Sequence, residues 1–204
     1  MAIEKDFFRQ VMGQFATGVT VVTTGNNNTL SGLTVNAFCS VSLDPPLVLI
    51  CVDHNSNTLS AIRESGTFVV NILTDQQEHL SRCFATSSQE RYEHFCHASY
   101  STAATGSPVI DGVLAFIDAR VVAEYPGGDH AIFLGHVEAM GTNGKVASAN
   151  GIHTYEETQI GHNGKTAEGE KVPLAYYRGQ YRHLANNYRK ASLATAAYYN
   201  EDFE

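Results

Sequence analysis

The residues with the clearest chemical potential form a four-residue segment, "NSNT" at 55–58, that lies between an apolar run and a helical pattern. The pattern "SNTLSAIRESG" at 56–66 predicts a short capped helix. The first turn of a helix carries free N–H groups and a partial positive charge, and together these bind phosphate. Three side chains of the segment would add donors to such a site: Ser56, Asn57 and Thr58. The same residue types also serve as plain helix caps, which is their more common use.

A second segment, "GLTVNAFCSVSL" at 32–43, alternates strictly between apolar and polar residues and predicts a strand with two different faces. Its odd-numbered residues, Leu33 to Leu43, are apolar and predict a side that faces the core. Its other face holds Thr34, Asn36, Phe38, Ser40 and Ser42, and no residue from Gln10 to Leu43 is charged. Small neutral hydrogen-bonding groups suit a large, flat, polar ligand such as a flavin ring. A strand at a dimer interface, or beneath a loop, would show the same pattern and is the more common case.

The elements that must position these two segments are short strands and a few helices. The expected strands are 19–24, 32–43, 47–52, 67–73, the two arms of a hairpin at 112–140 around "PGGD", and 173–184. The expected helices are 4–16, 56–66, 74–85 and 188–199. Short local connections between strands favour a mostly β fold, an antiparallel barrel with helices packed outside. The polar stretch at 151–171 is expected to be a surface loop.

Composition limits the class of protein. The chain has 204 residues, about the size of one domain, and its 43% hydrophobic and 17% charged residues argue against disorder. A net charge of −8 disfavours nucleic acid and anionic membranes as partners. No apolar run approaches the roughly 18 residues of a membrane-spanning helix. The four cysteines have no short metal-binding spacing, and "HFCH" at 94–97 lacks a second ligand pair, so we expect no metal site and reduced thiols in a cytoplasmic protein.

Five segments together resemble one known family, the short-chain flavin reductases that form the small reductase component of two-component flavin monooxygenases. The segments are "FATGVTVVTT", "GLTVNAFCSVSLDPPLVLICV", "SGTFVVNIL", "SRCFA" and "GDHAIFLGHV", in this order. The resemblance covers about 8–184 and implies an FMN-binding split β-barrel, antiparallel and of Greek-key type, usually in a homodimer. We therefore expect one domain over 1–204, in which the insertion at 151–171 and the extension at 185–204 depart from the family pattern.

The resemblance also implies a set of site residues. Flavin contacts are implied for the ring at Thr34, Val35, Asn36, Ala37 and Ser40, along the ribityl chain at Cys51, Val52 and Asp53, and near the phosphate at Ser56, Asn57 and Thr58. In "SRCFA", Phe84 and Ala85 match a further flavin-contacting segment, and Arg82 is a candidate partner of the phosphate. His130 of "GDH" matches a histidine beside the nicotinamide. Tyr177 and Arg178 are additional candidates near the cofactor, although an aromatic strand in a core or interface is their more common role.

The implied activity is hydride transfer from NADH or NADPH to FMN or FAD, with the reduced flavin passing to a partner oxygenase. The cofactors carry this chemistry, and the protein binds and orients them. The sequence agrees, since it offers no evident nucleophile or acid–base pair and no G-x-G-x-x-G motif. Two alternatives stay open: an electron-transfer protein that keeps its FMN, and an enzyme like pyridoxamine-phosphate oxidase. The latter needs a cationic phosphate site, and no lysine lies between Lys5 and Lys145.

Overall fold

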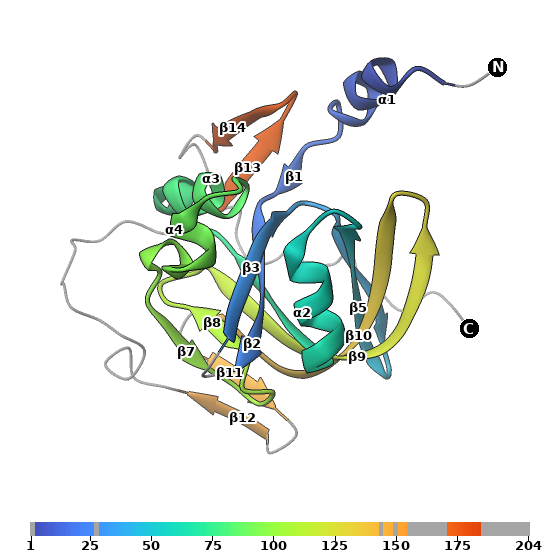
Figure 1. Ribbon diagram of the computed structural model, residues 1–204. Helices are drawn as coiled ribbons and strands as arrows, with labels where there is room; N and C mark the ends of the chain where they lie inside the picture. The colour runs from blue at the N-terminus through green and yellow to red at the C-terminus, as the bar shows by residue number, and fades with distance from the viewer. Residues whose placement is uncertain (1–2, 27–28, 143–144, 149–150, 155–170, 185–204) are drawn as a thin grey trace, which may run out of the picture.

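The computed structural model describes residues 3–26, 29–142, 145–148, 151–154 and 171–184 (Figure 1). Its main element is a nine-stranded antiparallel sheet that contains the path β12-β11-β10-β9-β6-β2-β3, with β5 added to β10 and β4 added to β5. The strands are β2 (Thr20–Asn26), β3 (Thr29–Val35), β4 (Phe38–Leu43), β5 (Pro46–Asp53), β6 (Thr67–Ile72), β9 (Ala115–Gly127), β10 (His130–Thr142), β11 (Lys145–Ser148) and β12 (Gly151–Thr154). The sheet curls into a barrel, as the sequence predicts.

The barrel closes between β3 and β4, two of the edge strands of the sheet, which follow one another in the chain. Only two residues, Asn36 and Ala37, separate them, and both are exposed. The core joins both ends of the sheet, because Val35 of β3 packs in one cluster with Ile50 of β5 and Phe133 of β10. The exposed backbone at 36–37, beside the filled core, is therefore a candidate ligand-binding region.

All the helices of the described chain except the N-terminal one pack against the barrel (Figure 1). Helix α2 (Asn57–Ser65) follows β5 directly and adds Leu59 and Ile62 to the barrel core. Ser56 caps its first turn, and Gly66 ends it with φ 67°. Helix α3 (Glu78–Phe84), preceded by the 3₁₀ turn η1 (Asp75–Gln77), packs beside α4 (Gln89–Tyr92) and a second 3₁₀ turn, η2 (Phe95–His97). The helices predicted at 56–66 and 74–85 are thereby confirmed.

The prediction of one continuous strand at 32–43 is wrong. The break at 36–37 shifts the alternation, so that Phe38 packs against the core and the odd-numbered residues after it face outward. Leu43 is 91% exposed, and Val41 and Cys39 are exposed too. Periodicity alone cannot reveal this, because a two-residue interruption leaves the spacing of apolar letters unchanged.

Other boundaries also differ from the predicted ones. The segment 173–184 is a hairpin, β13 (Leu174–Tyr177) and β14 (Gln180–His183), whose first strand pairs with β1 (Thr17–Gly18). A further small hairpin joins β7 (Tyr100–Thr102) to β8 (Pro108–Ile110). The long hairpin at 112–140 is confirmed as β9 and β10. Strand β12, which pairs with β11, takes up the start of the predicted 151–171 loop. The predicted helix at 188–199 lies outside the described residues.

Helix α1 (Lys5–Met12) is shorter than the predicted 4–16 and projects away from the barrel (Figure 1). Its amphipathic pattern is present, yet none of its residues is buried. The exposed apolar side chains of this arm are Ile3, Phe7, Phe8, Val11, Met12 and Phe15. The expected apolar face therefore exists without a partner inside the described chain.

The expectation of four reduced thiols is also wrong. Cys83 of α3 and Cys96 of η2 form a disulfide, with their Cα atoms 6.0 Å apart, while Cys39 and Cys51 are free. The backbone beside this disulfide is unusual, because Phe95, Cys96 and His97 have φ values of 50°, 54° and 52°. Each non-glycine residue in this left-handed region costs about 1–2 kcal/mol. Such a turn persists only where its surroundings hold it in place.

Within the described residues, no helix is long and apolar enough to cross a bilayer. The same residues contain no group of three or more His, Cys, Asp or Glu side chains placed to hold a metal ion.

Candidate functional site

The end of β5 and the start of α2 form a polar corner. Asp53 accepts hydrogen bonds from the backbone N–H of Asn55 at 2.8 Å and from its Nδ2 at 2.9 Å. The backbone bond is the main reason that the pKa of Asp53 lies below its usual value. Ser56 Oγ accepts from the backbone N–H of Thr58 at 3.3 Å. The corner thus combines a fixed carboxylate with the first turn of a helix, where backbone donors point outward.

His130 lies directly beside this corner. It is the first residue of β10 and pairs in register with Asp53 across the sheet. The turn before it is tied to the same place, because the His54 N–H donates to the Asp129 carbonyl at 3.1 Å. The His130 ring, 39% exposed, has its Nδ1 2.7 Å from Asp129 Oδ1. This hydrogen bond is the largest cause of the lowered pKa of Asp129. The predicted nicotinamide residue and the predicted ribityl residue are therefore neighbours.

Arg91, which was not among the predicted site residues, places a buried positive charge beside the start of α2. Arg91 of α4 is only 8% exposed. Its Nε donates to the Gly32 carbonyl at 2.8 Å, and its Nη2 donates to Thr58 Oγ1 at 3.3 Å. Thr58 also receives a hydrogen bond from Ser31 Oγ at 2.9 Å. No carboxylate of the described chain forms a salt bridge with Arg91, and burial lowers the pKa of this guanidinium.

An uncompensated buried charge is costly, so its retention calls for an explanation. A guanidinium presents five N–H donors, and the two contacts to Gly32 and Thr58 engage only part of them. An anion at the start of α2 would complete the arrangement, because both the helix terminus and the cation favour negative charge there. Arg91 thus fits a phosphate group. In the sequence it lies in "SSQERYEHF", where flanking acidic residues give it the look of an ordinary surface arginine.

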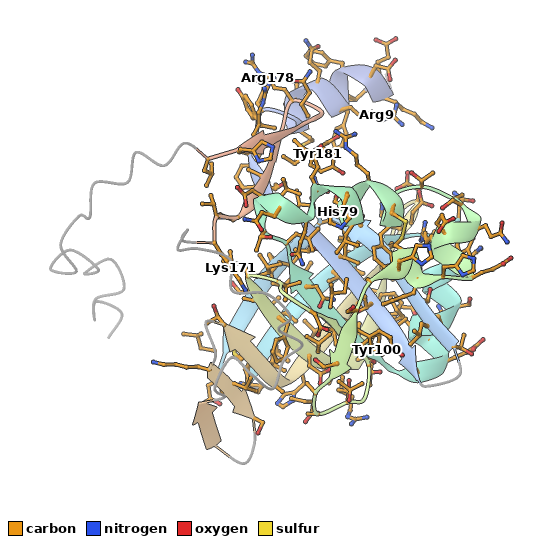
Figure 2. The ribbon with its side chains drawn as sticks, turned by 90° about the vertical axis from the view of Figure 1, so that its left-hand side faces the viewer. Arg9, His79, Tyr100, Lys171, Arg178 and Tyr181 are labelled. Atoms are coloured by element: carbon orange, nitrogen blue, oxygen red, sulfur yellow. A yellow bond between two sulfur atoms is a disulfide. The ribbon has the colours of Figure 1, made fainter. Side chains whose placement is uncertain are left out.

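Arg82, the phosphate partner suggested by the sequence, is engaged elsewhere. Its Nη2 lies 2.6 Å from Glu78 Oε1, and its guanidinium lies 4.7 Å from the centre of the Tyr181 ring. These residues line an open pocket of about 650 Å³ between α3 and the β13–β14 hairpin, with Tyr181 labelled in Figure 2. Ala85 lies on the same pocket wall. Glu78 already pairs with Arg82, whereas Arg91 has no carboxylate partner in the described chain, so Arg91 is a second candidate beside Arg82 for binding an anion.

The residues predicted to contact the ring lie along the end of β3 and the beginning of β4. Asn36 is exposed, and its Nδ2 is 3.5 Å from Thr17 Oγ1. The Thr34 hydroxyl donates to the Ser81 carbonyl at 2.6 Å, which ties the strand to α3. Ala37 and Ser40 are exposed. Asn36 and its neighbouring backbone are therefore the groups best placed to meet a ligand.

Several predicted contact residues have buried side chains. Those of Val35, Val52, Thr58 and Phe84 are at most 6% exposed. Any contact that these residues make with a ligand must come from their backbone. Phe84 instead has a packing role, because a Cβ added at Gly32 would lie 2.8 Å from its ring. Cys51 is half-buried, and burial, followed by the nearby Cys39 thiol, raises its pKa.

Tyr177 and Arg178 hold the chain that follows α1. Arg178 Nε donates to Gln14 Oε1 at 2.9 Å, and the Arg178 backbone N–H donates to the Gly13 carbonyl at 2.9 Å. Tyr177 reaches the same glutamine at 3.5 Å. Figure 2 shows Arg178 beside α1, on the side of the molecule where Arg9 also lies. The structure thus places both residues with the projecting arm, whereas Asp53, His130 and Ser56 gather at the polar corner.

Comparison with known proteins identifies the family of the chain. A family model described as a flavin reductase like domain matches residues 12–185. The chain belongs to this family. Both the resemblance predicted from the sequence and the β fold class are confirmed.

Individual relatives agree with the family assignment. The reductase subunit HsaB of a flavin-dependent monooxygenase from Mycobacterium tuberculosis is 32% identical over 202 residues, which are 99% of this chain and 91% of HsaB. Among solved structures, nitrilotriacetate monooxygenase component B from Mycobacterium thermoresistibile gives a TM-score of 0.74 at 33% identity, over 92% of this chain and 90% of that one. The NADH:FAD oxidoreductase SgcE6 of Streptomyces globisporus, solved with NAD and FAD fragments, gives a TM-score of 0.72 at 31% identity, over 91% of this chain and 95% of SgcE6.

Proposed function

We propose that this protein is an NAD(P)H:flavin oxidoreductase that reduces FMN or FAD and supplies the reduced flavin to a partner oxygenase. The observation that carries the proposal is the polar corner itself. It combines the start of α2, the uncompensated Arg91 and the Asp53–His130 pair at one edge of the barrel. Relatives named as reductase subunits of flavin-dependent monooxygenases support the same activity. An NADH-dependent flavin reductase from Rhodococcus, 34% identical over 181 residues, supports NADH as the hydride donor.

Bound flavin would accept a hydride from the nicotinamide, and both cofactors supply that chemistry themselves. The chain's own residues bind and orient. The Asn36 amide and the exposed backbone at 36–37 would hold the polar edge of the ring, with Thr34 and Ser40 on either side. Asp53, fixed by Asn55, would accept hydrogen bonds from the ribityl hydroxyls beside Cys51. The helix terminus at 56–58, together with Arg91, would bind the phosphate.

His130 would act by position. Its contact with Asp129 and its place beside Asp53 orient the ring, while its exposed side is open to a second ligand. Such a residue suits stacking or hydrogen bonding to a nicotinamide. A direct hydride transfer requires no proton carrier at this place, and proximity of the two cofactor rings supplies most of the rate.

We also propose that the protein is a cytoplasmic homodimer. The arm that carries α1 exposes a continuous apolar face, and Val41 and Leu43 of β4 expose a second apolar surface. A soluble monomer rarely leaves large apolar surfaces of this kind uncovered. A second copy of this chain would bury them. We expect light scattering to give twice the chain mass of 22.2 kDa, and Phe8→Asp to halve the measured mass by placing a charge in the interface. A wild-type protein that elutes as a monomer at micromolar concentration would exclude the dimer.

The activity is tested by steady-state oxidation of NADH and NADPH with FMN, FAD and riboflavin as acceptors. We expect turnover with at least one phosphorylated flavin, and loss of flavin binding in Asn36→Leu without loss of the folded state. Absence of turnover with every pair of cofactors would refute the proposal. Flavin that stays bound through gel filtration, together with one-electron transfer to an acceptor, would instead favour a protein that keeps its FMN.

A further inference from the structure

The segment that carries Arg91 is enclosed by the Cys83–Cys96 disulfide. The two cysteines are 13 positions apart, and α4 lies between them. The disulfide therefore closes a ring of chain that contains Arg91, the buried cation of the candidate phosphate site. Cys96 is 8% exposed, and Cys83 is the less buried partner.

Within the described chain, this ring is attached to the barrel through side chains and not through backbone hydrogen bonds. Its backbone hydrogen bonds are local, because the N–H groups of Tyr92, Glu93, His97 and Ala98 donate to carbonyls three or four residues earlier. Phe95 packs edge-on against Phe84 and Tyr100, with ring centres 5.2 and 5.6 Å apart. Phe84, Phe95 and Cys96 also belong to a buried cluster that contains Val21 of β2, and Arg91 adds its two hydrogen bonds to this packing.

The backbone at the disulfide is held in an unfavourable conformation. Phe95, Cys96 and His97 all lie in the left-handed region, which an aromatic residue such as Phe95 adopts rarely. A turn of this kind relaxes when one of the groups that hold it is released. Arg91 is four residues before this turn, so relaxation would move the guanidinium relative to Thr58 and Gly32.

We propose that Cys83 and Cys96 form a reversible redox site that controls the affinity of the enzyme for phosphorylated flavin. In a reducing compartment, a disulfide is usually transient and serves catalysis or redox sensing. The inference rests on the proposed function, because it requires that Arg91 bind the flavin phosphate.

The exchange involves two electrons and a dithiol partner. A thiolate of the partner attacks the more accessible Cys83 sulfur, the Cys83–Cys96 bond breaks, and Cys96 leaves as a thiolate that takes up a proton. The partner's second thiolate then displaces Cys83, which leaves two cysteine thiols in the protein and one disulfide in the partner. The same exchange run backward with an oxidised partner restores the bond. The oxidised enzyme keeps Arg91 in the site, and the reduced enzyme releases it.

The experiment compares the dissociation constants of FMN and riboflavin, measured by fluorescence titration of the full chain before and after treatment with dithiothreitol. Thiol counting should rise from two to four, and mass spectrometry of peptides should locate the bond. We expect reduction to weaken FMN binding about ten-fold, the loss of one charge-assisted hydrogen bond, and to change riboflavin binding less than about two-fold. Riboflavin lacks the phosphate, so it reports on the rest of the site.

Three variants separate this mechanism from general loosening. The double variant Cys83→Ser/Cys96→Ser should bind FMN as the reduced wild type does, with or without dithiothreitol. Arg91→Met should bind FMN weakly and lose the redox response. Cys39→Ser, which removes an exposed free thiol that takes no part in the disulfide, should keep the full redox response. If the double variant fails to fold, the comparison of the oxidised with the reduced wild type still tests the proposal.

Unchanged FMN affinity in a protein with four counted thiols would overturn the proposal. An equal loss of affinity for FMN and for riboflavin would also overturn it, since the whole flavin site would then open on reduction. A thiol count that does not rise would show that no such bond exists. Absence of flavin binding in both redox states would refute the proposed function, a result distinct from tight binding that ignores the redox state.

Discussion

Replacing Arg91 by methionine tests the assignment of the phosphate site most directly. Methionine keeps most of the side-chain volume and removes the charge together with the two hydrogen bonds to Gly32 and Thr58. We expect Arg91→Met to lose affinity for FMN and to leave affinity for riboflavin nearly unchanged, because only FMN carries the phosphate.

The magnitude follows from the burial of this arginine. A hydrogen bond to a charged group contributes about 1.5–3 kcal/mol, which corresponds to a loss of roughly ten- to a hundred-fold in FMN affinity. The substitution should change the stability of the folded protein less than it changes the affinity for FMN. The variant gives up two hydrogen bonds, but it also relieves the desolvation of a cation that is 92% buried and has no carboxylate partner in the described chain. We therefore expect its free energy of unfolding to differ from that of the wild type by no more than about 1–2 kcal/mol.

The assay is fluorescence titration with both flavins, supported by the rise in melting temperature at saturating FMN. Arg82→Met is the matched control, since it removes an exposed arginine that Glu78 already pairs. The control should keep the wild-type preference for FMN over riboflavin. If Arg91→Met bound FMN as tightly as the wild type, or if Arg82→Met lost the preference instead, the phosphate would have to lie elsewhere.

Three further changes give independent tests. His130→Ala should raise the KM for the nicotinamide or slow hydride transfer by about 1–2 kcal/mol, with flavin affinity intact; a loss of 10²–10⁴-fold with a matching pH profile would instead identify an acid or base. Gly135→Ala should destabilise the fold by about 1–3 kcal/mol, because its Cβ would lie 2.5 Å from the buried Phe68 ring; an unchanged urea midpoint would contradict the close packing. Burial raises the pKa of Asp118 in the folded state, so stability falls as pH rises from about 4 through this raised value. Urea unfolding should therefore show that the stability of the wild type, relative to Asp118→Asn, decreases over that interval, and a constant difference would argue against a buried carboxylate.

The barrel could be predicted from the sequence because its strands carry strong local signals. The turn at "PGGD" fixes the β9–β10 hairpin, and the capping residues around 56–66 fix α2. The break at 36–37 could not be predicted, because it changes the phase of the alternation without changing the spacing of apolar residues. The sequence likewise gives no sign that the apolar face of α1 lacks a partner inside the chain.

The candidate site was predictable to the extent that its residues are adjacent in sequence. Ser56 and Asp53 lie within four positions of each other, and His130 stands out through the family motif. Arg91 is different, because it reaches the start of α2 from a separate helix, 33 positions away from Thr58. Its burial depends on how α4 packs, and no local pattern encodes that. The Cys83–Cys96 bond escaped prediction for the same reason, as composition alone favours free thiols in a cytoplasmic protein.

Gly32 places a limit on how this protein can vary in evolution. Its backbone carbonyl accepts a hydrogen bond from Arg91 Nε. The Phe84 ring fills the space that a side chain at position 32 would need, because an added Cβ would lie 2.8 Å from this ring. A larger residue at 32 would be tolerated only with a smaller one at 84, and neither change alone would be neutral. We therefore expect these two positions to vary together among relatives, glycine with an aromatic ring and alanine or serine with a smaller side chain. Substitutions at Gly32 and Phe84 would also displace Arg91. A change in core packing would therefore alter the selectivity of the protein among flavins.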